Sequence, residues 1–405
     1  MSISANCPSD FGWSRLGKGR LELHELMPYI WGLYRVMKYN WFLWIFGVMS
    51  PVLLAQQREL KPVAIELDYF YGSILEHNSD IAHLITGHPT GFNIVYNRKT
   101  YGYNEWESRY NYPDWGFTFN YQDMGNPYLG KNYGLYGHFN WYFWKRRLRL
   151  GIGQGVAMAG NPYDPEDNYQ NTAYGSRFMS TTFLKFNLIQ ENLYRGLGFR
   201  LGTGIIHYSN ANFKAPNNST NTLYFSAGVS YQSQEGVILT RHNHGDWPSE
   251  YYSEPITVNA VFRTGLNEAD VIGLGQYPFY VFSFFADKRV NYKSTVQLGV
   301  DFFFSDFLIH LIRYRESAFP GDGIEPGLDY RRIGVFLGHE FRFRKTAFVA
   351  QLGRYFYWPY EFENRIYNRL GLKRYFGKEH FFAAVTLKAH WAKAEAVEFG
   401  IGYRL

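Results

Sequence analysis

The chain has 405 residues, a modest formal net charge of +6 and an aromatic content of 20%. Its mean hydropathy is negative, which argues against a bundle of membrane-spanning helices, and its basic residues gather in turns without the aromatic interleaving of a nucleic-acid surface. The only cysteine is Cys7, so the rest of the chain has no disulfide, thiol nucleophile or cysteine metal site. Many aromatics and glycines in a chain of moderate hydropathy are typical of a transmembrane β-barrel, in which each strand is only half apolar.

One continuously apolar stretch lies near the start of the chain. It begins at Met37, has the basic Lys38 near its start, and ends at Ala55, a small residue suited to cleavage. This pattern predicts a secretory signal peptide over 37–55. We therefore expect Met37 to be the natural start and residues 1–36 to be a mis-annotated leader. A signal anchor with a cytoplasmic tail is the alternative.

Beyond residue 60, two-residue alternation predicts an all-β chain. In the stretch AVEFGIGYRL at the C-terminus, apolar residues alternate with glycine and charged residues. Rows of glycine on the second face are typical of a barrel and not of a soluble sandwich. We expect about sixteen antiparallel strands, near 62–71, 91–99, 115–123, 133–144, 147–158, 176–190, 197–209, 222–234, 254–265, 276–288, 292–304, 330–343, 345–356, 367–376, 379–391 and 395–405.

The predicted connections alternate in length. Links after odd strands tend to be long and those after even strands short, as in bacterial outer-membrane barrels. Two links, 100–114 and 235–253, are long where a short one is expected. The segment DFLIHLIRYRESAF, residues 306–319, reads either as a short amphipathic helix or as a strand extension.

Two halves of the chain resemble each other weakly. YGLYGHFNWYFWKRRLRLGIGQG in the first half is echoed by RRIGVFLGHEFRFRKTAFVAQLG in the second. We predict an eight-strand unit over 56–234, a linker or long periplasmic turn over 235–253, and a diverged eight-strand repeat over 254–405. Whether the strands close into two small barrels or one large barrel stays open.

A candidate reaction centre lies at the end of the seventh strand, in HYSNANFKAPN. His207 and Ser209 share the face of that strand that carries its apolar residues, and residues two apart on a strand are separated by about 6.5 Å. A serine hydroxyl becomes a nucleophile when a neighbouring base accepts its proton, and histidine is the usual base. The alternative is a pair of polar strand-end residues at the level of the lipid headgroups.

This segment resembles the active-site segment of the lipid A 3-O-deacylases, the PagL-like and acyloxyacyl hydrolase family of outer-membrane barrels. The resemblance covers about residues 62–233 and implies a carboxylic ester hydrolase. It implies Ser209 as nucleophile, His207 as general base and Asn210 as an oxyanion donor, with Lys214 and Asn217 in the substrate-binding loop.

The same resemblance implies lipid A, lipopolysaccharide and outer-membrane lipids as partners. It places the chain in the bacterial outer membrane with the site facing the outer leaflet. No cofactor, metal or nucleic acid is expected, and a homodimer is left open. A non-catalytic barrel, either porin-like or a surface-binding scaffold, is the alternative function.

One position departs from the family pattern. The family has a glutamate about fourteen residues after the histidine, to orient the imidazole, whereas this chain has Asn221. An asparagine carbonyl can hold the tautomer without supplying charge, so we expect Asn221 in the catalytic set with slower turnover. Alternatively, a carboxylate of the loop 159–175 (Asp164, Glu166 or Asp167) reaches the histidine, or the enzyme is inactive.

Two further histidine-containing segments are weaker candidates. His390 corresponds to His207 in the second half, but Ala392 and Lys393 replace the serine and asparagine, so a structural role is expected. The segment RHNHGDW offers His242, His244 and Asp246 at a spacing compatible with a metal. No further ligand is evident there, and a turn is the better interpretation.

Overall fold

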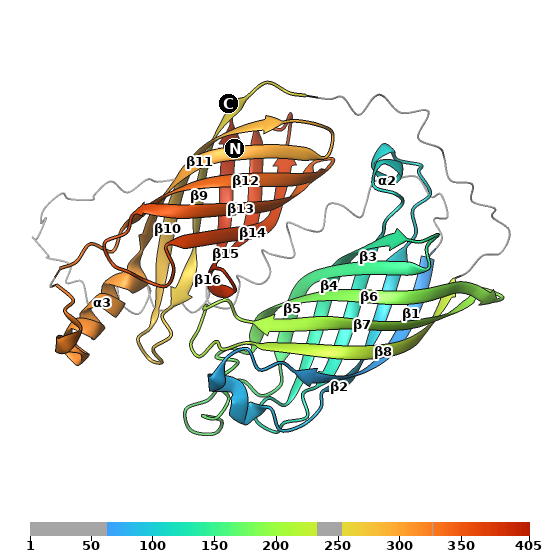
Figure 1. The fold of residues 1–405 in the computed structure, drawn as a ribbon, viewed down its shortest axis with the longest axis horizontal. Helices are drawn as coiled ribbons and strands as arrows, with labels where there is room; N and C mark the ends of the chain where they lie inside the picture. The colour runs from blue at the N-terminus through green and yellow to red at the C-terminus, as the bar shows by residue number, and fades with distance from the viewer. Residues whose placement is uncertain (1–62, 233–252, 326) are drawn as a thin grey trace, which may run out of the picture. The chain divides into compact units, whose positions relative to one another are not determined.

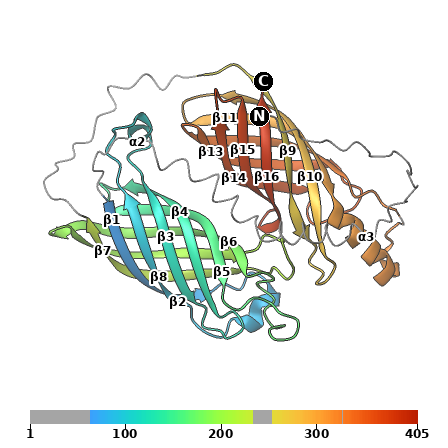
Figure 2. The ribbon, with the colours of Figure 1, turned by 180° about the vertical axis from the view of Figure 1, so that it is seen from behind.

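The computed structural model describes residues 63–232 and 253–405, except residue 326 (Figure 1). The predicted leader, signal peptide and nearly all of the linker lie outside these residues, as do His242, His244 and Asp246. The described residues are mainly β-strand and form two closed barrels, each of eight antiparallel strands (Figures 1 and 2). The question of one barrel or two is thereby answered in favour of two.

The first barrel closes because β8 pairs with β1 as well as with β7. Each strand otherwise pairs with its neighbour along the chain. Its strands are β1 (Val63–Ile74), β2 (Thr90–Arg98), β3 (Asp114–Asp123), β4 (Lys131–Phe143), β5 (Leu148–Ala159), β6 (Phe178–Tyr194), β7 (Leu197–Ser209) and β8 (Thr220–Gln232).

The second barrel closes in the same way, through pairing of β16 with β9. Its strands are β9 (Thr257–Glu268), β10 (Gln276–Arg289), β11 (Ser294–Ser305), β12 (Arg332–Phe343), β13 (Thr346–Tyr357), β14 (Ile366–Phe376), β15 (Phe381–His390) and β16 (Lys393–Arg404). All sixteen predicted strands are therefore present, with ends that differ from the prediction by a few residues.

Helices occur only in connections of the described chain. The unexpectedly long link 100–114 holds the short helix α2 (Glu105–Arg109), and 306–319 forms α3 (Asp306–Ala318), which decides between the helix and the strand extension. Two 3-10 turns, η2 (Ser79–Leu84) and η4 (Pro320–Asp322), lie in other loops. None of the helices among the described residues has both the length and the apolarity needed to cross a membrane.

Strand β7 shows how the alternating sequence selects its two faces. Leu201 and Ile205 point away from the barrel axis, whereas Arg200 and Ile206 are buried inside the barrel. The same alternation leaves large apolar side chains exposed all around both barrels. An apolar outer surface on a closed barrel is the arrangement that a lipid bilayer requires, since closure satisfies every backbone hydrogen bond within the sheet.

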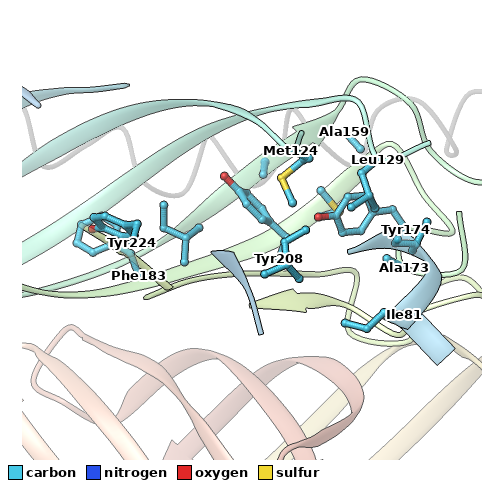
Figure 3. Packing of buried hydrophobic residues seen from close by; sticks show 14 of the residues in the cluster. Ile81, Met124, Leu129, Ala159, Ala173, Tyr174, Phe183, Tyr208 and Tyr224 are labelled. Atoms are coloured by element: carbon cyan, nitrogen blue, oxygen red, sulfur yellow. The ribbon is translucent and has the colours of Figure 1, made fainter. Parts of the chain in front are cut away.

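Four loops lie at one end of the first barrel, which we call the site end: 75–89, 124–130, 160–177 and 210–219. The opposite end carries the tight turns after β4 and β6 together with the loop that contains α2. Because β6 continues to Tyr194, its turn is shorter than the predicted link 191–196. The loops of the site end pack down onto the barrel, and Ile81, Leu129 and Tyr174 join the interior cluster of Figure 3.

Side chains fill the interior of the first barrel. Phe183, Tyr208 and Tyr224 belong to its apolar cluster (Figure 3). The interior also holds a buried ion pair, in which Arg149 Nη1 lies 2.8 Å from Glu66 Oε1. An eight-stranded barrel is just wide enough for side chains to fill, so the described interior forms a packed core and not a pore.

The interior of the second barrel is filled mainly by ion pairs and aromatic rings. Arg369 Nη1 lies 3.0 Å from Asp301 Oδ2, and Arg332 Nη2 lies 2.6 Å from Glu395 Oε1, all four side chains being buried. Such pairs are stable only while each charge keeps its partner. This barrel is likewise sealed in the part of the chain that the structure describes.

Candidate functional site

His207 and Asn221 are direct cross-strand partners on the outer face of the first barrel. The two residues pair in the β7–β8 ladder, and His207 Nδ1 lies 2.8 Å from Asn221 Oδ1. Because an amide oxygen only accepts, Nδ1 carries the proton and Nε2 is left with its lone pair. The imidazole is thus held in the tautomer that a general base needs.

Ser209 lies two residues beyond His207 and is the last residue of the same strand. Its side chain is only 5% exposed, because the following loop folds back over the strand end. Ser209 Oγ donates a hydrogen bond to Asn217 Oδ1 at 3.1 Å and accepts one from the backbone N–H of Ala211 at 3.0 Å. In this arrangement the serine proton points to the loop, so rotation about one side-chain bond is needed to aim it at His207.

The buried residue between His207 and Ser209 fixes their position. Tyr208 points into the barrel, is fully buried, and donates its hydroxyl proton toward Asn120 Oδ1 at 2.7 Å and Gln122 Oε1 at 3.2 Å (Figure 3). A buried hydroxyl with satisfied partners is costly to move. The strand is therefore locked at the point where it presents His207 and Ser209 on the opposite side.

Asn210 and Asn217 organise the loop that covers Ser209. Asn217 Oδ1 accepts from the backbone N–H of Asn210 at 2.9 Å as well as from Ser209. Asn210 Nδ2 donates to the backbone oxygen of Lys214 at 2.6 Å. Since an amide nitrogen carries two protons, this hydrogen bond uses only one of the two N–H groups of Asn210. The side chain of Lys214 is exposed at the rim of this loop.

The carboxylates that were considered as substitutes for a glutamate are engaged elsewhere or exposed. Asp164 Oδ1 accepts from the backbone N–H groups of Asp167 and Glu166 at 3.0 and 2.9 Å, and these hydrogen bonds hold the pKa of Asp164 below its usual value. The histidine Nδ1 is paired with Asn221 instead. Within the described chain, the orienting group of His207 is the amide.

Sequence reasoning missed three polar neighbours of the site on the outer face. Thr182 pairs directly with His207 and Ser180 with Ser209 across the β6–β7 ladder, and Gln154 pairs with Thr182 across the β5–β6 ladder. Their outward positions in otherwise apolar stretches were the available signal. A polar side chain on that face is expensive in lipid and calls for an explanation.

The second barrel does not repeat the site. His390 is buried inside it, where Nε2 lies 2.7 Å from Glu395 Oε2, and Ala392 lies in the turn that follows β15. The imidazole is thus part of the interior ion-pair network. This placement agrees with a structural role.

These features define a class of protein: a membrane β-barrel that carries a His-Ser-Asn cluster on the outside of its wall. The family model described as "Lipid A 3-O-deacylase (PagL)" matches residues 90–230, and "Acyloxyacyl hydrolase, C-terminal domain" matches residues 256–405. The chain therefore belongs to the PagL family of lipid A deacylases. Hydrolase activity on lipid A and a place in the outer membrane are the properties that this membership supports.

The other comparisons found only distant likenesses. No curated protein matches the sequence. Similar solved structures include a triple mutant of the Rhodopseudomonas blastica porin, at 10% identity and a TM-score of 0.18, covering 85% of this chain and 99% of that one. Acinetobacter baumannii OccAB3 has the same identity and coverages and a TM-score of 0.20.

Proposed function

We propose that the chain removes an ester-linked acyl chain from lipid A by serine–histidine catalysis. The observation that carries the proposal is the hydrogen bond of His207 Nδ1 to Asn221, which leaves Nε2 of the same ring as a base two residues from Ser209. A hydroxyl, a base and an orienting group within one cluster are the parts of a covalent hydrolase. No cofactor enters this chemistry.

The reaction runs through an acyl-enzyme. Ser209 Oγ attacks the ester carbonyl carbon while His207 Nε2 takes its proton. The remaining N–H of Asn210 donates to the oxygen on which negative charge develops. Collapse breaks the bond to the sugar oxygen, which receives the proton from His207. Water then attacks the acyl-enzyme by the same route, which releases the fatty acid and restores the Ser209 hydroxyl.

The proposed site faces the outer leaflet of the outer membrane. His207 and Ser209 lie at the site end, where long loops replace tight turns, and long loops are typical of the extracellular end of bacterial barrels. Their outward direction supports attack on a lipid that stays in the bilayer. Lys214, exposed on the loop after Ser209, is suited to the negative charges of lipopolysaccharide.

The test is expression in a bacterium with fully acylated lipid A, followed by mass spectrometry of that lipid. Loss of one ester-linked acyl chain with the native protein, and full retention with Ser209→Ala at equal barrel abundance, is the expected result. Unchanged lipid A with both proteins overturns the proposal. Unchanged lipid A together with faster uptake of small solutes indicates a pore instead.

A further inference from the structure

A row of polar residues crosses the outer face of the first barrel and ends at the proposed site. Register places Asn221, His207, Thr182 and Gln154 opposite one another on β8, β7, β6 and β5. Gly137 of β4 is the next partner in the row. The row thus runs straight across five neighbouring strands, starting from the catalytic pair.

Gln154 is a polar residue on the otherwise apolar, lipid-facing side of β5. It is exposed in the middle of β5, and its outward neighbours Ile152 and Val156 are large apolar residues at 42% and 38% exposure. A polar amide in this position costs free energy in hydrocarbon unless its hydrogen bonds are satisfied. Its position is that of a binding group and not of a strand end.

Hydrogen bonds between side chains hold Gln154 in one orientation. Its Oε1 accepts from Thr182 Oγ1 at 2.5 Å, and its Nε2 donates to Ser180 Oγ at 2.9 Å. Within the described barrel, this leaves the second N–H of Gln154 and the hydroxyl proton of Ser180 as donors to an oxygen outside the wall. No cation takes part in the row, so it complements a neutral oxygen better than a phosphate.

Gly137 leaves a gap beside Gln154. A side-chain carbon placed on Gly137 meets nothing within 4 Å, so no side chain covers the outer surface of the wall at the far end of the row. On either side along β4, Leu135 and Phe139 supply apolar bulk. The gap gives a substrate group access to the Gln154 amide.

We propose that Gln154, Ser180 and Thr182 form a subsite that binds a neutral oxygen of the glycolipid, a carbonyl or a sugar hydroxyl, next to the scissile ester. Gln154 and Ser180 donate to this oxygen, and Thr182 fixes the Gln154 amide. The subsite rests on the proposed hydrolase activity, since its function is to hold the substrate against Ser209 and His207. Gly137 keeps the approach open.

The experiment compares Gln154→Leu, Thr182→Val and Gly137→Leu with the native protein on lipid A dispersed in detergent. Gln154→Leu removes a donor, Thr182→Val removes the hydrogen bond that orients Gln154, and Gly137→Leu fills the gap. All three keep the outer face apolar, so folding is not expected to suffer. We expect kcat/KM to fall about five- to tenfold for Gln154→Leu, the size of one or two neutral hydrogen bonds. Thr203→Val is the matched control, because Thr203 also faces outward on β7 but lies about 13 Å from His207.

A second measurement separates binding from catalysis. In a Ser209→Ala background, lipid A should bind more weakly when Gln154→Leu or Gly137→Leu is added, and with native affinity when Thr203→Val is added. Unchanged binding and kcat/KM in all three row variants overturns the subsite, as does an equal loss in the Thr203→Val control. If Ser209→Ala itself keeps full activity, the proposed function fails, and that result is distinct from failure of the subsite alone.

Discussion

His207 Nδ1 and Asn221 Oδ1 lie 2.8 Å apart across the β7–β8 ladder. The amide fixes the direction of the imidazole but carries no charge. In the proposed reaction His207 takes up the serine proton, and the resulting imidazolium would be stabilised by a dipole where a carboxylate would supply a full negative charge. We therefore expect the proposed reaction to be slower than it would be with a carboxylate in place of Asn221.

Replacing Asn221 tests this interpretation. We expect Asn221→Glu to raise kcat for lipid A about five- to tenfold, because a charge-assisted hydrogen bond is worth more than a neutral one. Asn221→Leu should lower kcat by a similar factor, since the ring loses its acceptor. Asn221→Gln controls for side-chain length, and equal gains from Gln and Glu would show that charge is not the cause. Fatty acid release measures all three.

Asn217 is expected to act as a positioning residue for Ser209 and Asn210, since its Oδ1 accepts from both. Asn217→Ala should lower kcat about tenfold with a smaller effect on KM, because the reacting groups lose their alignment. Asn217→Asp keeps the acceptor and should recover part of the loss. If kcat of Asn217→Asp is no higher than kcat of Asn217→Ala, this role is contradicted.

Tyr208 should couple stability to activity. Tyr208→Phe removes a buried hydroxyl that satisfies Asn120 and Gln122, so we expect a loss of about 1–3 kcal/mol in the free energy of unfolding, with a fall in kcat. Denaturant titration of the barrel in detergent micelles gives the first quantity. Tyr69→Phe is the control, since Tyr69 is 60% exposed on the outer face and should change neither.

In the second barrel, Glu395 should be a sensitive interior position. Glu395→Gln leaves Arg332 and Lys388 buried without their common carboxylate, at an expected cost of about 3–5 kcal/mol. Folded protein should keep its native activity per molecule, because the proposed catalytic groups belong to the first barrel. The exposed Glu361→Gln serves as the control for stability. An unchanged unfolding midpoint for Glu395→Gln would count against the network.

Much of the architecture was accessible from sequence because alternation acts residue by residue. The predicted bounds of the seventh strand, 197–209, agree with β7, since apolar and small or polar residues alternate along its whole length. Closure was not accessible, because it depends on whether β8 pairs with β1 or with β9. Both strands offer the same alternating pattern, and only the three-dimensional pairing decides.

The candidate site residues could be named from the sequence, but their contacts could not. The burial of Ser209 could not be read from the strand pattern, because Asn217, eight residues later, folds back and bonds to its hydroxyl. The way this loop folds back depends on its backbone geometry, which the alternation of apolar and polar residues does not encode. Gln154 lies on another strand, and its nearness to His207 follows from register across two ladders.

The outward direction of His207 sets how the proposed enzyme meets its substrate. A sealed wall offers no internal passage, so molecules arrive by sliding sideways within the membrane plane. Turnover should then follow the mole fraction of lipid A in the surface and not its bulk concentration, and diluting the substrate with inert detergent at constant total amount should slow the reaction. Catalysis of this kind is a two-dimensional encounter, controlled by how crowded the leaflet is.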